Sequence, residues 1–355
     1  MRIAVDAMGG DHGPAVVVAG AVEGARAFGV ALDLVGQEAT VRRELAKVDA
    51  AGIDVVVLDA PDEIGMDEHP AQAVRRKPRS SIAVALEAVR DGRSGAMLSA
   101  GNSGAVMAAA LLVLGRVPGV DRPAIASFLP SSGKRSLVLD LGAVTDPRPP
   151  HLVQFAQMGS LYVKRALGVE RPTVALLSNG EEPSKGNQLV RDASSLLAAT
   201  PGIDFRGNVE GKDVTRGVAD VIVTDGFTGN VALKVAEGVA TLVTDALRAE
   251  VTATLPRKLA ALALRPAFRA VGARLDYAET GGAPLLGVNG MVVIAHGRSN
   301  AKAIRNAIGV ACRGAESDAT GTIRQLMARG TSDPPPTTAA GPPEVPINGN
   351  ASTAR

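Results

Sequence analysis

The sequence predicts an α/β fold in which a largely parallel sheet is flanked by helices. Short runs rich in Val, Ile and Leu recur along the chain, as they do in strands buried on both faces. Between most of these runs lie Ala-rich stretches whose apolar residues recur every three or four positions. This alternation is typical of parallel strands joined by crossover helices.

The expected elements follow one another along the chain. We expect strands at residues 3–7, 32–35, 55–58, 96–98, 137–141, 174–177, 221–224 and 292–295. Helical spacing is clear at residues 82–89, 106–114, 189–197 and 231–247, and each of these stretches follows a predicted strand. We therefore expect these helices to cover the sheet.

The length and composition indicate an ordinary globular protein of one or two domains. The chain has 355 residues, of which 46% are apolar and 21% are charged. We expect one α/β domain over residues 1–330, with a helical arm at about 247–278 within it. Residues 331–355 are rich in proline and have no apolar period, which predicts a disordered tail.

Composition also excludes several classes of function. A net charge of +2, no Trp and only 2% aromatic residues argue against binding to nucleic acid. Because the chain has only one cysteine, Cys312, neither an intramolecular disulfide nor a Cys-rich metal site can form. Cys312 lies in a helical pattern and is expected in the core. Asp6 interrupts the first apolar run, and no stretch reaches the roughly 18 apolar residues of a membrane-spanning helix. We expect a cytoplasmic protein.

Five turns rich in Gly, Asn, Ser and Asp stand where a predicted strand ends and a helix begins. They cover residues 6–14, 99–104, 178–187, 225–230 and 296–302. Because parallel strands present their carboxyl ends at one edge of a sheet, we expect these turns to lie together. Glycine allows close approach of the backbone and helix N-termini offer free N–H groups, so the turns suit an anion such as phosphate. One such turn alone is more often structural, whereas five on one edge favour a function.

Most common catalytic signatures are absent from the sequence. There is no P-loop, no dinucleotide-binding fingerprint, no His-Glu-x-x-His and no Gly-x-Ser-x-Gly. The chemistry must therefore be one that the five turns can support without those motifs.

The opening residues 3–12, Ile-Ala-Val-Asp-Ala-Met-Gly-Gly-Asp-His, resemble the signature of the bacterial phosphate acyltransferase family of phospholipid synthesis. Further similar segments occur in the same order at residues 99–105, 185–187, 207–211, 225–234, 282–287 and 296–304. The resemblance runs from Met1 to about residue 329. The chain differs at Val144, where the family usually has Asn after Gly-Ala, which puts one polar contact in question.

The resemblance implies an enzyme that reversibly transfers a long-chain fatty acyl group from acyl carrier protein to inorganic phosphate. The acyl phosphate would serve a membrane glycerol-3-phosphate acyltransferase in making phosphatidic acid. The resemblance also implies a fold like that of isocitrate and isopropylmalate dehydrogenases, and a homodimer. Because phosphate is itself a nucleophile and a thiolate leaves readily, neither a metal nor another cofactor is expected.

Lys185 and Asn230 match positions that the family's motifs imply are catalytic. An ammonium can hold phosphate, and a carboxamide N–H can donate to the oxyanion of the tetrahedral intermediate. The structural alternatives are a solvated lysine at a helix start and an N-cap asparagine. The candidate phosphate- and substrate-binding residues are the polar and glycine residues of the same turns: Asp6, Gly9, Gly10, His12, Asn102, Ser103, Gly104, Gly186, Asn187, Asp225, Gly226, Thr228, Gly229, His296, Ser299 and Asn300.

The remaining histidines, His69 and His151, each lie beside proline in a polar stretch. We expect both at the surface. His12 and His296 are better candidates to donate to phosphate or to protonate the departing sulfur, although a structural hydrogen bond accounts for them equally well.

The predicted arm carries two amphipathic stripes. Leu255, Leu259 and Leu262 form one, and Leu264, Phe268, Val271 and Leu275 form the other, with a bend expected at Pro266. Related family members imply that this region builds the dimer and touches the bilayer. The candidate contacts to an anionic membrane surface, or to an acidic carrier protein, are Lys258, Leu259, Leu262, Arg265, Phe268 and Arg269. The alternative is a solvated charged face over a packed core stripe.

Two rival functions belong to other classes. One is an NAD- and metal-dependent hydroxy-acid dehydrogenase, with Asp140, Asp146 and Asp225 as metal ligands. The other is a non-catalytic scaffold for acyl carrier protein or the membrane. Cofactor binding would favour the first, and a failure to form acyl phosphate would favour the second.

Overall fold

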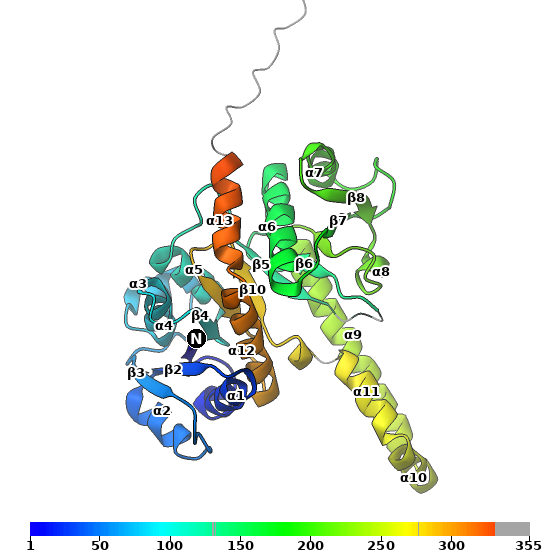
Figure 1. Cartoon of the computed structure of the whole chain (residues 1–355). Helices are drawn as coiled ribbons and strands as arrows, with labels where there is room; N and C mark the ends of the chain where they lie inside the picture. The colour runs from blue at the N-terminus through cyan, green and yellow to red at the C-terminus, as the bar shows by residue number, and fades with distance from the viewer. Residues whose placement is uncertain (130, 132, 276, 331–355) are drawn as a thin grey trace, which may run out of the picture.

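The computed structural model of the chain describes residues 1–129, 131, 133–275 and 277–330 (Figure 1). The predicted tail at 331–355 lies outside this part. The described residues form one 11-stranded sheet in the order β3-β2-β1-β4-β11-β10-β5-β6-β9-β7-β8. The strands are β1 (Arg2–Asp6), β2 (Ala31–Gly36), β3 (Val55–Asp59), β4 (Ala96–Ser99), β5 (Ala124–Phe128), β6 (Leu137–Leu139), β7 (Thr173–Leu177), β8 (Asp204–Val209), β9 (Val221–Val223), β10 (Ala283–Leu286) and β11 (Met291–Ile294).

The sheet consists of two parallel halves. One half holds β3, β2, β1, β4 and β11, and the other holds β6, β9, β7 and β8. Between them, β10 and β5 pair antiparallel with each other and with the neighbouring halves. The largely parallel sheet is confirmed. The prediction that all five turns share one edge is wrong, because three antiparallel pairings in a row reverse the second half.

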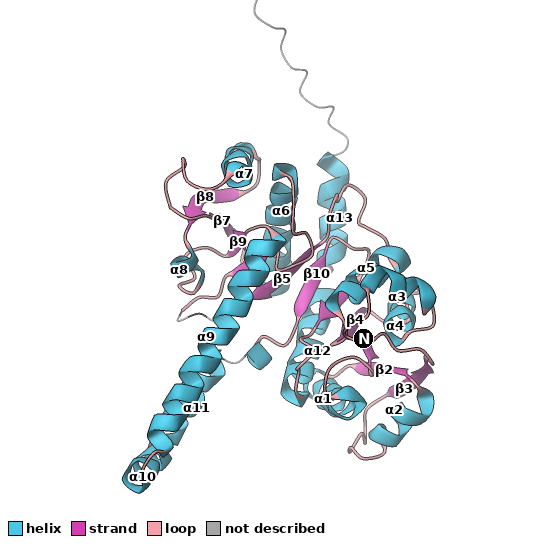
Figure 2. Cartoon of the chain, turned by 180° about the vertical axis from the view of Figure 1, so that it is seen from behind, coloured by secondary structure: helices cyan, strands magenta, loops and turns pink. Residues whose placement is uncertain are grey.

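Helices cover both faces of the sheet (Figures 1 and 2). α1, α6, α7, α12 and α13 contribute side chains to one core cluster, in which Cys312 is buried as predicted. α3, α4 and α5 contribute to a second cluster. The helices are α1 (Gly13–Phe28), α2 (Glu38–Leu45), α3 (Pro70–Arg76), α4 (Ser81–Arg90), α5 (Ser103–Val113), α6 (Pro149–Leu167), α7 (Gln188–Ala199), α8 (Gly211–Val214), α9 (Gly226–Thr252), α10 (Leu255–Ala263), α11 (Arg265–Leu275), α12 (Ala301–Glu316) and α13 (Ala319–Gly330), with a short 3-10 turn η1 (Tyr277–Glu279).

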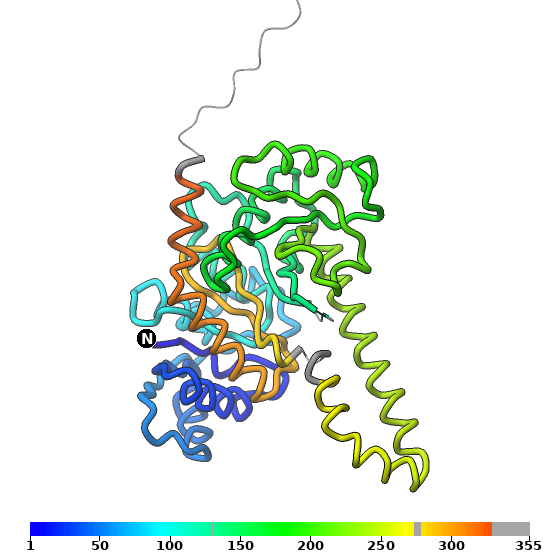
Figure 3. The backbone as a smooth tube through the Cα atoms, turned by 45° about the vertical axis from the view of Figure 1, so that its right-hand side comes forward, coloured from blue at the N-terminus to red at the C-terminus, as the bar shows by residue number. Residues whose placement is uncertain are grey.

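A helical arm projects from the body of the protein (Figure 3). The two short helices predicted on either side of the bend are present as α10 and α11. The arm reaches further inward than predicted, because α9 runs for 27 residues from the turn at Asp225 without a break. One continuous helix therefore runs from the turn at Asp225 out to the tip of the arm, where α10 follows it.

The described part of the chain contains no helix with both the length and the apolar character that crossing a membrane requires.

Candidate active site

The turn after β1 is held by a buried carboxylate. Asp6 Oδ1 accepts hydrogen bonds from the N–H groups of Met8 (3.1 Å) and Gly9 (3.2 Å), and Oδ2 accepts one from Ser99 Oγ (2.6 Å). Burial raises the pKa of Asp6 above its ordinary value. A Cβ atom at Gly9 would lie 2.6 Å from the backbone nitrogen of Gly101, so only glycine lets these two turns approach.

The turn after β11 joins the same cluster. The backbone N–H of Asp11 donates to the carbonyl of Gly297 at 2.7 Å. Asn102 Nδ2 donates to the carbonyls of Met66 (3.0 Å) and Glu68 (3.1 Å), which adds the loop before α3. Three turns thus meet, at residues 6–12, 99–104 and 296–300. Helices α1, α5 and α12 begin at these turns.

Four predicted binding residues are N-caps. Their side-chain oxygens accept backbone hydrogen bonds at 2.8–3.1 Å from the first turns of α5, α7, α9 and α12. These residues hold helix N-termini in place, so their effect on an anion is through the helices they start. They are Asn102, Asn187, Asp225 and Asn300.

Other predicted residues keep groups that are available to a ligand. The buried hydroxyl of Ser299 has no hydrogen-bond partner among the described residues. His12 is exposed at the start of α1 and makes no side-chain capping bond. Ser103 and Gly104 lie in the first turn of α5, and Gly10 lies in the turn after β1.

In the second half, Asp140 organises the turn after β6. Its carboxylate accepts hydrogen bonds from the N–H groups of Ile125 (3.0 Å), Gly142 (3.2 Å), Ala143 (3.0 Å) and Val144 (2.6 Å). Burial nevertheless raises the pKa of Asp140 to about 6. Sequence reasoning named Asp140 only as a possible metal ligand, and its role as an anchor depends on a backbone path that motifs do not show.

The start of α9 sits directly on this turn. The N–H of Gly226 donates to the carbonyl of Val144 at 2.8 Å. A Cβ atom at Gly226 would lie 2.6 Å from Asp140 Oδ2, and one at Gly229 would collide with the carbonyl oxygen of Asp140. These two glycines therefore allow the first turn of α9 to pack closely against the turn after β6. Thr228 lies between them in the first turn and is exposed at the surface.

Asn230 lies just inside α9, beside this turn. A Cβ atom placed at Gly142 would be 3.7 Å from its Cγ atom. The N-cap alternative is wrong for Asn230, because Asp225 caps the helix. Its exposed carboxamide makes no hydrogen bond to any residue that the structure describes.

Lys185 belongs to the turn after β7. The turn is held by a bond from the N–H of Gly186 to Asn179 Oδ1 (2.9 Å) and by one from Asn208 Nδ2 to the carbonyl of Glu182 (3.0 Å). The ammonium of Lys185 is exposed and forms no ion pair within the described part of the chain. Because β7 pairs with β9, the turns of Lys185 and Asn230 follow neighbouring parallel strands.

Three side chains connect the two halves. Lys234 Nζ lies 3.2 Å from His296 Nε2 and 3.2 Å from Glu237 Oε2. His296 Nδ1 accepts from the N–H of Arg298 (3.1 Å), so a neutral ring carries its hydrogen on Nε2. Burial and then the charge of Lys234 lower the pKa of His296. An imidazole N–H and an ammonium thus converge on the Glu237 carboxylate, whose Oε2 also lies 3.8 Å from His296 Nε2.

Sequence reasoning missed Lys234 and Glu237 as site residues. Lys234 follows Asn230 by four positions, which places both on one face of a helix. That spacing was the available signal.

Comparison with known proteins now decides the family. Residues 1–321 match the family model described as fatty acid synthesis protein. A protein of Geobacter sulfurreducens named phosphate acyltransferase is 51% identical over 308 residues, which cover 87% of this chain and 89% of that protein. The chain belongs to the phosphate acyltransferase family. A member from Trichlorobacter lovleyi is 46% identical over 333 residues, covering 94% of this chain and 95% of its own.

Solved structures share the fold. A phosphotransacetylase from Streptococcus pyogenes superposes with a TM-score of 0.61 at 17% identity, covering 89% of this chain and 94% of its own. The EutD phosphotransacetylase from Staphylococcus aureus gives a TM-score of 0.58 at 16% identity, with the same coverage. At these identities the likeness concerns the fold alone.

At Val144, where the resemblance leads us to expect Asn, the backbone carries the structural contacts. Val144 makes its contacts to Asp140 and Gly226 through its backbone N–H and carbonyl. Those two contacts do not depend on its side chain. Valine at this position therefore preserves the packing of α9 against the turn after β6.

The site does not fit the metal-dependent dehydrogenase. Asp140 is buried and its carboxylate accepts hydrogen bonds from four backbone N–H groups, and the Asp225 carboxylate caps the N-terminus of α9. Elsewhere in the described residues, Glu181, Glu210 and Asp213 bring carboxylate oxygens within 4.8 Å of one another. Lys212 already pairs with Glu210 and, at 3.4 Å, with Glu181, so an ammonium occupies the place of a cation.

The two remaining histidines differ in exposure. His69 is exposed as predicted. The same prediction is wrong for His151, which is only 4% exposed. Its Nδ1 accepts from the N–H of Arg148 at 3.0 Å and closes the first turn of α6, a role that the neighbouring prolines concealed.

Proposed function

We propose that this phosphate acyltransferase reversibly transfers a long-chain fatty acyl group from acyl carrier protein to inorganic phosphate. The observation that carries the proposal is the set of unpartnered donors among helix N-termini. Lys185 and Asn230 have no partner in the described part of the chain, and Ser299 is buried without one. Such donors, left unpaired in the fold, suit an anionic substrate and a developing oxyanion.

The proposed reaction needs no activated protein nucleophile. A phosphate oxygen held by Lys185 attacks the thioester carbonyl carbon, and Asn230 donates to the oxygen of the tetrahedral intermediate. The carbon–sulfur bond then breaks, because the thiolate of a thiol with a pKa of about 8.5 is a good leaving group. The released thiolate takes up a proton from water. The reverse reaction is attack by the same thiolate on the acyl phosphate, which is also an activated acyl group.

A direct assay tests this proposal. Purified protein with palmitoyl carrier protein and phosphate should release free thiol and form a product that hydroxylamine traps as hydroxamate. Replacing the carrier with palmitoyl coenzyme A tests the choice of donor. If neither carrier yields thiol or hydroxamate, the chain has the scaffold role instead.

We further propose that the arm contacts the cytoplasmic face of the membrane. Leu259 and Leu262 are 62% and 63% exposed. Lys258, Arg265 and Arg269 are exposed and form no ion pair with a described residue. Each could gain about 1 kcal/mol beside anionic lipid. An acyl phosphate made there would pass directly to a membrane glycerol-3-phosphate acyltransferase.

The homodimer is proposed from the surface of α9. Apolar side chains follow one another at four-residue spacing on this helix and remain between 47% and 63% exposed. A second copy of the chain would remove this stripe from water, as in helical interfaces generally. The residues are Phe227, Val231, Val235 and Val239.

A further inference from the structure

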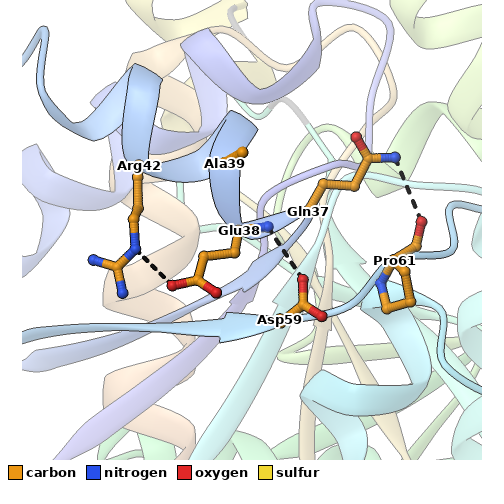
Figure 4. Close-up of a pocket in the computed structure, with 6 residues that line it drawn as sticks. All are labelled: Gln37, Glu38, Ala39, Arg42, Asp59 and Pro61. Atoms are coloured by element: carbon orange, nitrogen blue, oxygen red, sulfur yellow. Dashed lines mark hydrogen bonds and ion pairs between the residues drawn. The ribbon is translucent and has the colours of Figure 1, made fainter.

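Two cavities lie away from the turns of the active site, and they differ in chemistry. The first, of about 610 Å³, lies beside the ends of β2 and β3 (Figure 4). Arg42 Nε donates to Glu38 Oε1 at 2.7 Å, and the N–H of Glu38 donates to Asp59 Oδ1 at 3.3 Å. Its charged groups satisfy one another, so it offers little to a ligand.

The second cavity, of about 350 Å³, lies between α6 and α12. Its volume falls in the range of roughly 300–1,000 Å³ typical of small-molecule sites. Apolar side chains from three elements form its walls, namely Phe128 at the end of β5, Leu167 on α6 and Val310 on α12. An apolar group of a ligand would therefore find apolar neighbours there.

The hydroxyl of a largely buried tyrosine lies at this cavity without a protein partner. Tyr162 is 3% exposed, and its hydroxyl forms no hydrogen bond within the described part of the chain. The hydroxyl oxygen keeps some accessible surface, so a ligand in the cavity can reach it. Burial raises the pKa of Tyr162 to about 12, so the hydroxyl keeps its proton and is a donor at neutral pH.

Two guanidinium groups flank the same cavity. Arg135 and Arg313 are exposed, and neither forms an ion pair with any residue that the structure describes. The charge of Arg313 reaches Tyr162, whose pKa it lowers against the effect of burial. The one carboxylate of the lining, Glu279, pairs with Lys302 at 2.7 Å. The cavity thus combines apolar walls with positive charge.

We propose that this cavity binds an amphipathic anion, a single acyl or alkyl chain with a carboxylate or phosphate head. The head accepts from Arg135, Arg313 and the Tyr162 hydroxyl, and the chain packs against Phe128, Leu167 and Val310. Arginine suits both heads, because its planar fork matches their paired oxygens. None of the residues that hold this ligand belongs to the turns of the active site, so the site is separate from that of acyl transfer.

Calorimetric titration with decanoate, decyl phosphate and decanol below their micelle concentrations tests the proposal. We expect one saturable site per chain for the two anions and at least tenfold weaker binding of decanol, since charge-assisted hydrogen bonds contribute about 1.5–3 kcal/mol. Tighter binding of decanoate would identify a free fatty acid as the natural class, and tighter binding of decyl phosphate a phosphate-headed lipid.

Variants place the ligand in the cavity. The double variant Arg135→Gln/Arg313→Gln should bind both anions at least tenfold more weakly, while Arg171→Gln, at an exposed arginine outside the lining, should bind normally. The chain has no Trp and two Tyr, so tyrosine fluorescence should change on binding in the native chain and much less in Tyr162→Phe.

Two results would overturn the proposal. One is equal binding by the native chain and the double arginine variant when circular dichroism shows both folded. The other is loss of decanoate binding in Asn230→Ala, which would place the ligand in the transfer site. Neither depends on whether the acyl transfer reaction itself occurs.

Discussion

We propose Lys185 and Asn230 as the catalytic side chains. They stand in turns built by other residues, and each leaves its donor groups exposed and unpaired among the described residues. Removing either should therefore affect chemistry much more than folding.

We predict that Lys185→Ala and Asn230→Ala each lower turnover by at least about a hundredfold, the usual scale for the loss of one group that stabilises developing charge. Lys164→Ala is a matched control, because Lys164 is an exposed lysine on α6. Steady-state kinetics and thermal unfolding measure the two effects. Turnover near that of the native chain in either site variant would remove that residue from the mechanism.

The carboxyl of Asp140 should give stability a defined pH dependence. Its pKa is raised from 3.8 to about 6, so the folded state favours the protonated form. Its contribution is fully present below pH 3.8 and is lost as pH rises through about 6, by at most about 3 kcal/mol. Asp140→Asn should remove this pH-dependent contribution to the free energy of unfolding.

Urea unfolding of the native chain and Asp140→Asn at several pH values measures the difference in free energy of unfolding. The native chain should lose stability relative to the variant between pH 4 and 6.5, whatever the absolute cost of the lost acceptor oxygen. A difference that stays constant over this range would contradict the raised pKa.

Which turn residues touch substrate could not be predicted from residue types. Asn and Asp cap helices with the same oxygens that could serve a ligand. Asn102, Asn187, Asp225 and Asn300 all use them as caps. Ser299 differs only because its hydroxyl is buried without a partner, which depends on packing.

Among the elements, regular patterns were predictable and short mixed ones were not. The long apolar runs of β1 and β2 and the helical period of α9 were found where expected. The expected strands did not include β5, β8 or β10. β8 contains Asp204, Arg206 and Gly207, and β10 contains Pro284, so their apolar signal is weak. Missing β5 and β10 concealed the reversal of the sheet.

Membrane binding should depend on the exposed leucines of the arm. Replacing Leu259 and Leu262 by Glu should abolish co-sedimentation with anionic vesicles, because two charges would enter the apolar stripe of α10. Activity on soluble acyl carrier protein should persist, since both residues lie on α10 and outside the turns of the site. High salt should release the native chain from the vesicles.

The control is the pair Leu112→Glu and Leu196→Glu, two leucines exposed on α5 and α7. These changes add the same charge away from the arm and should leave vesicle binding intact. If the Leu259/Leu262 variant still sediments fully, another surface makes the membrane contact.

In the whole molecule, the site depends on the boundary between the two halves of the sheet. The turns around Asp6 and His296 come from one half, and Asp140, Asn230 and Lys185 come from the other. The contact of Lys234 with His296 spans that boundary. α9 starts there and continues into the arm, so a membrane contact at the tip would hold the site close to the bilayer.

We propose that the acyl group goes to phosphate and not to water. Phosphorus NMR of a reaction with palmitoyl carrier protein, followed together with thiol release, tests this most directly. We expect an acyl phosphate resonance to grow in step with thiol in the native chain, and both to be nearly absent in Asn230→Ala. Thiol release at the same rate without acyl phosphate from the start of the reaction, yielding only free fatty acid, would contradict it and indicate a thioesterase.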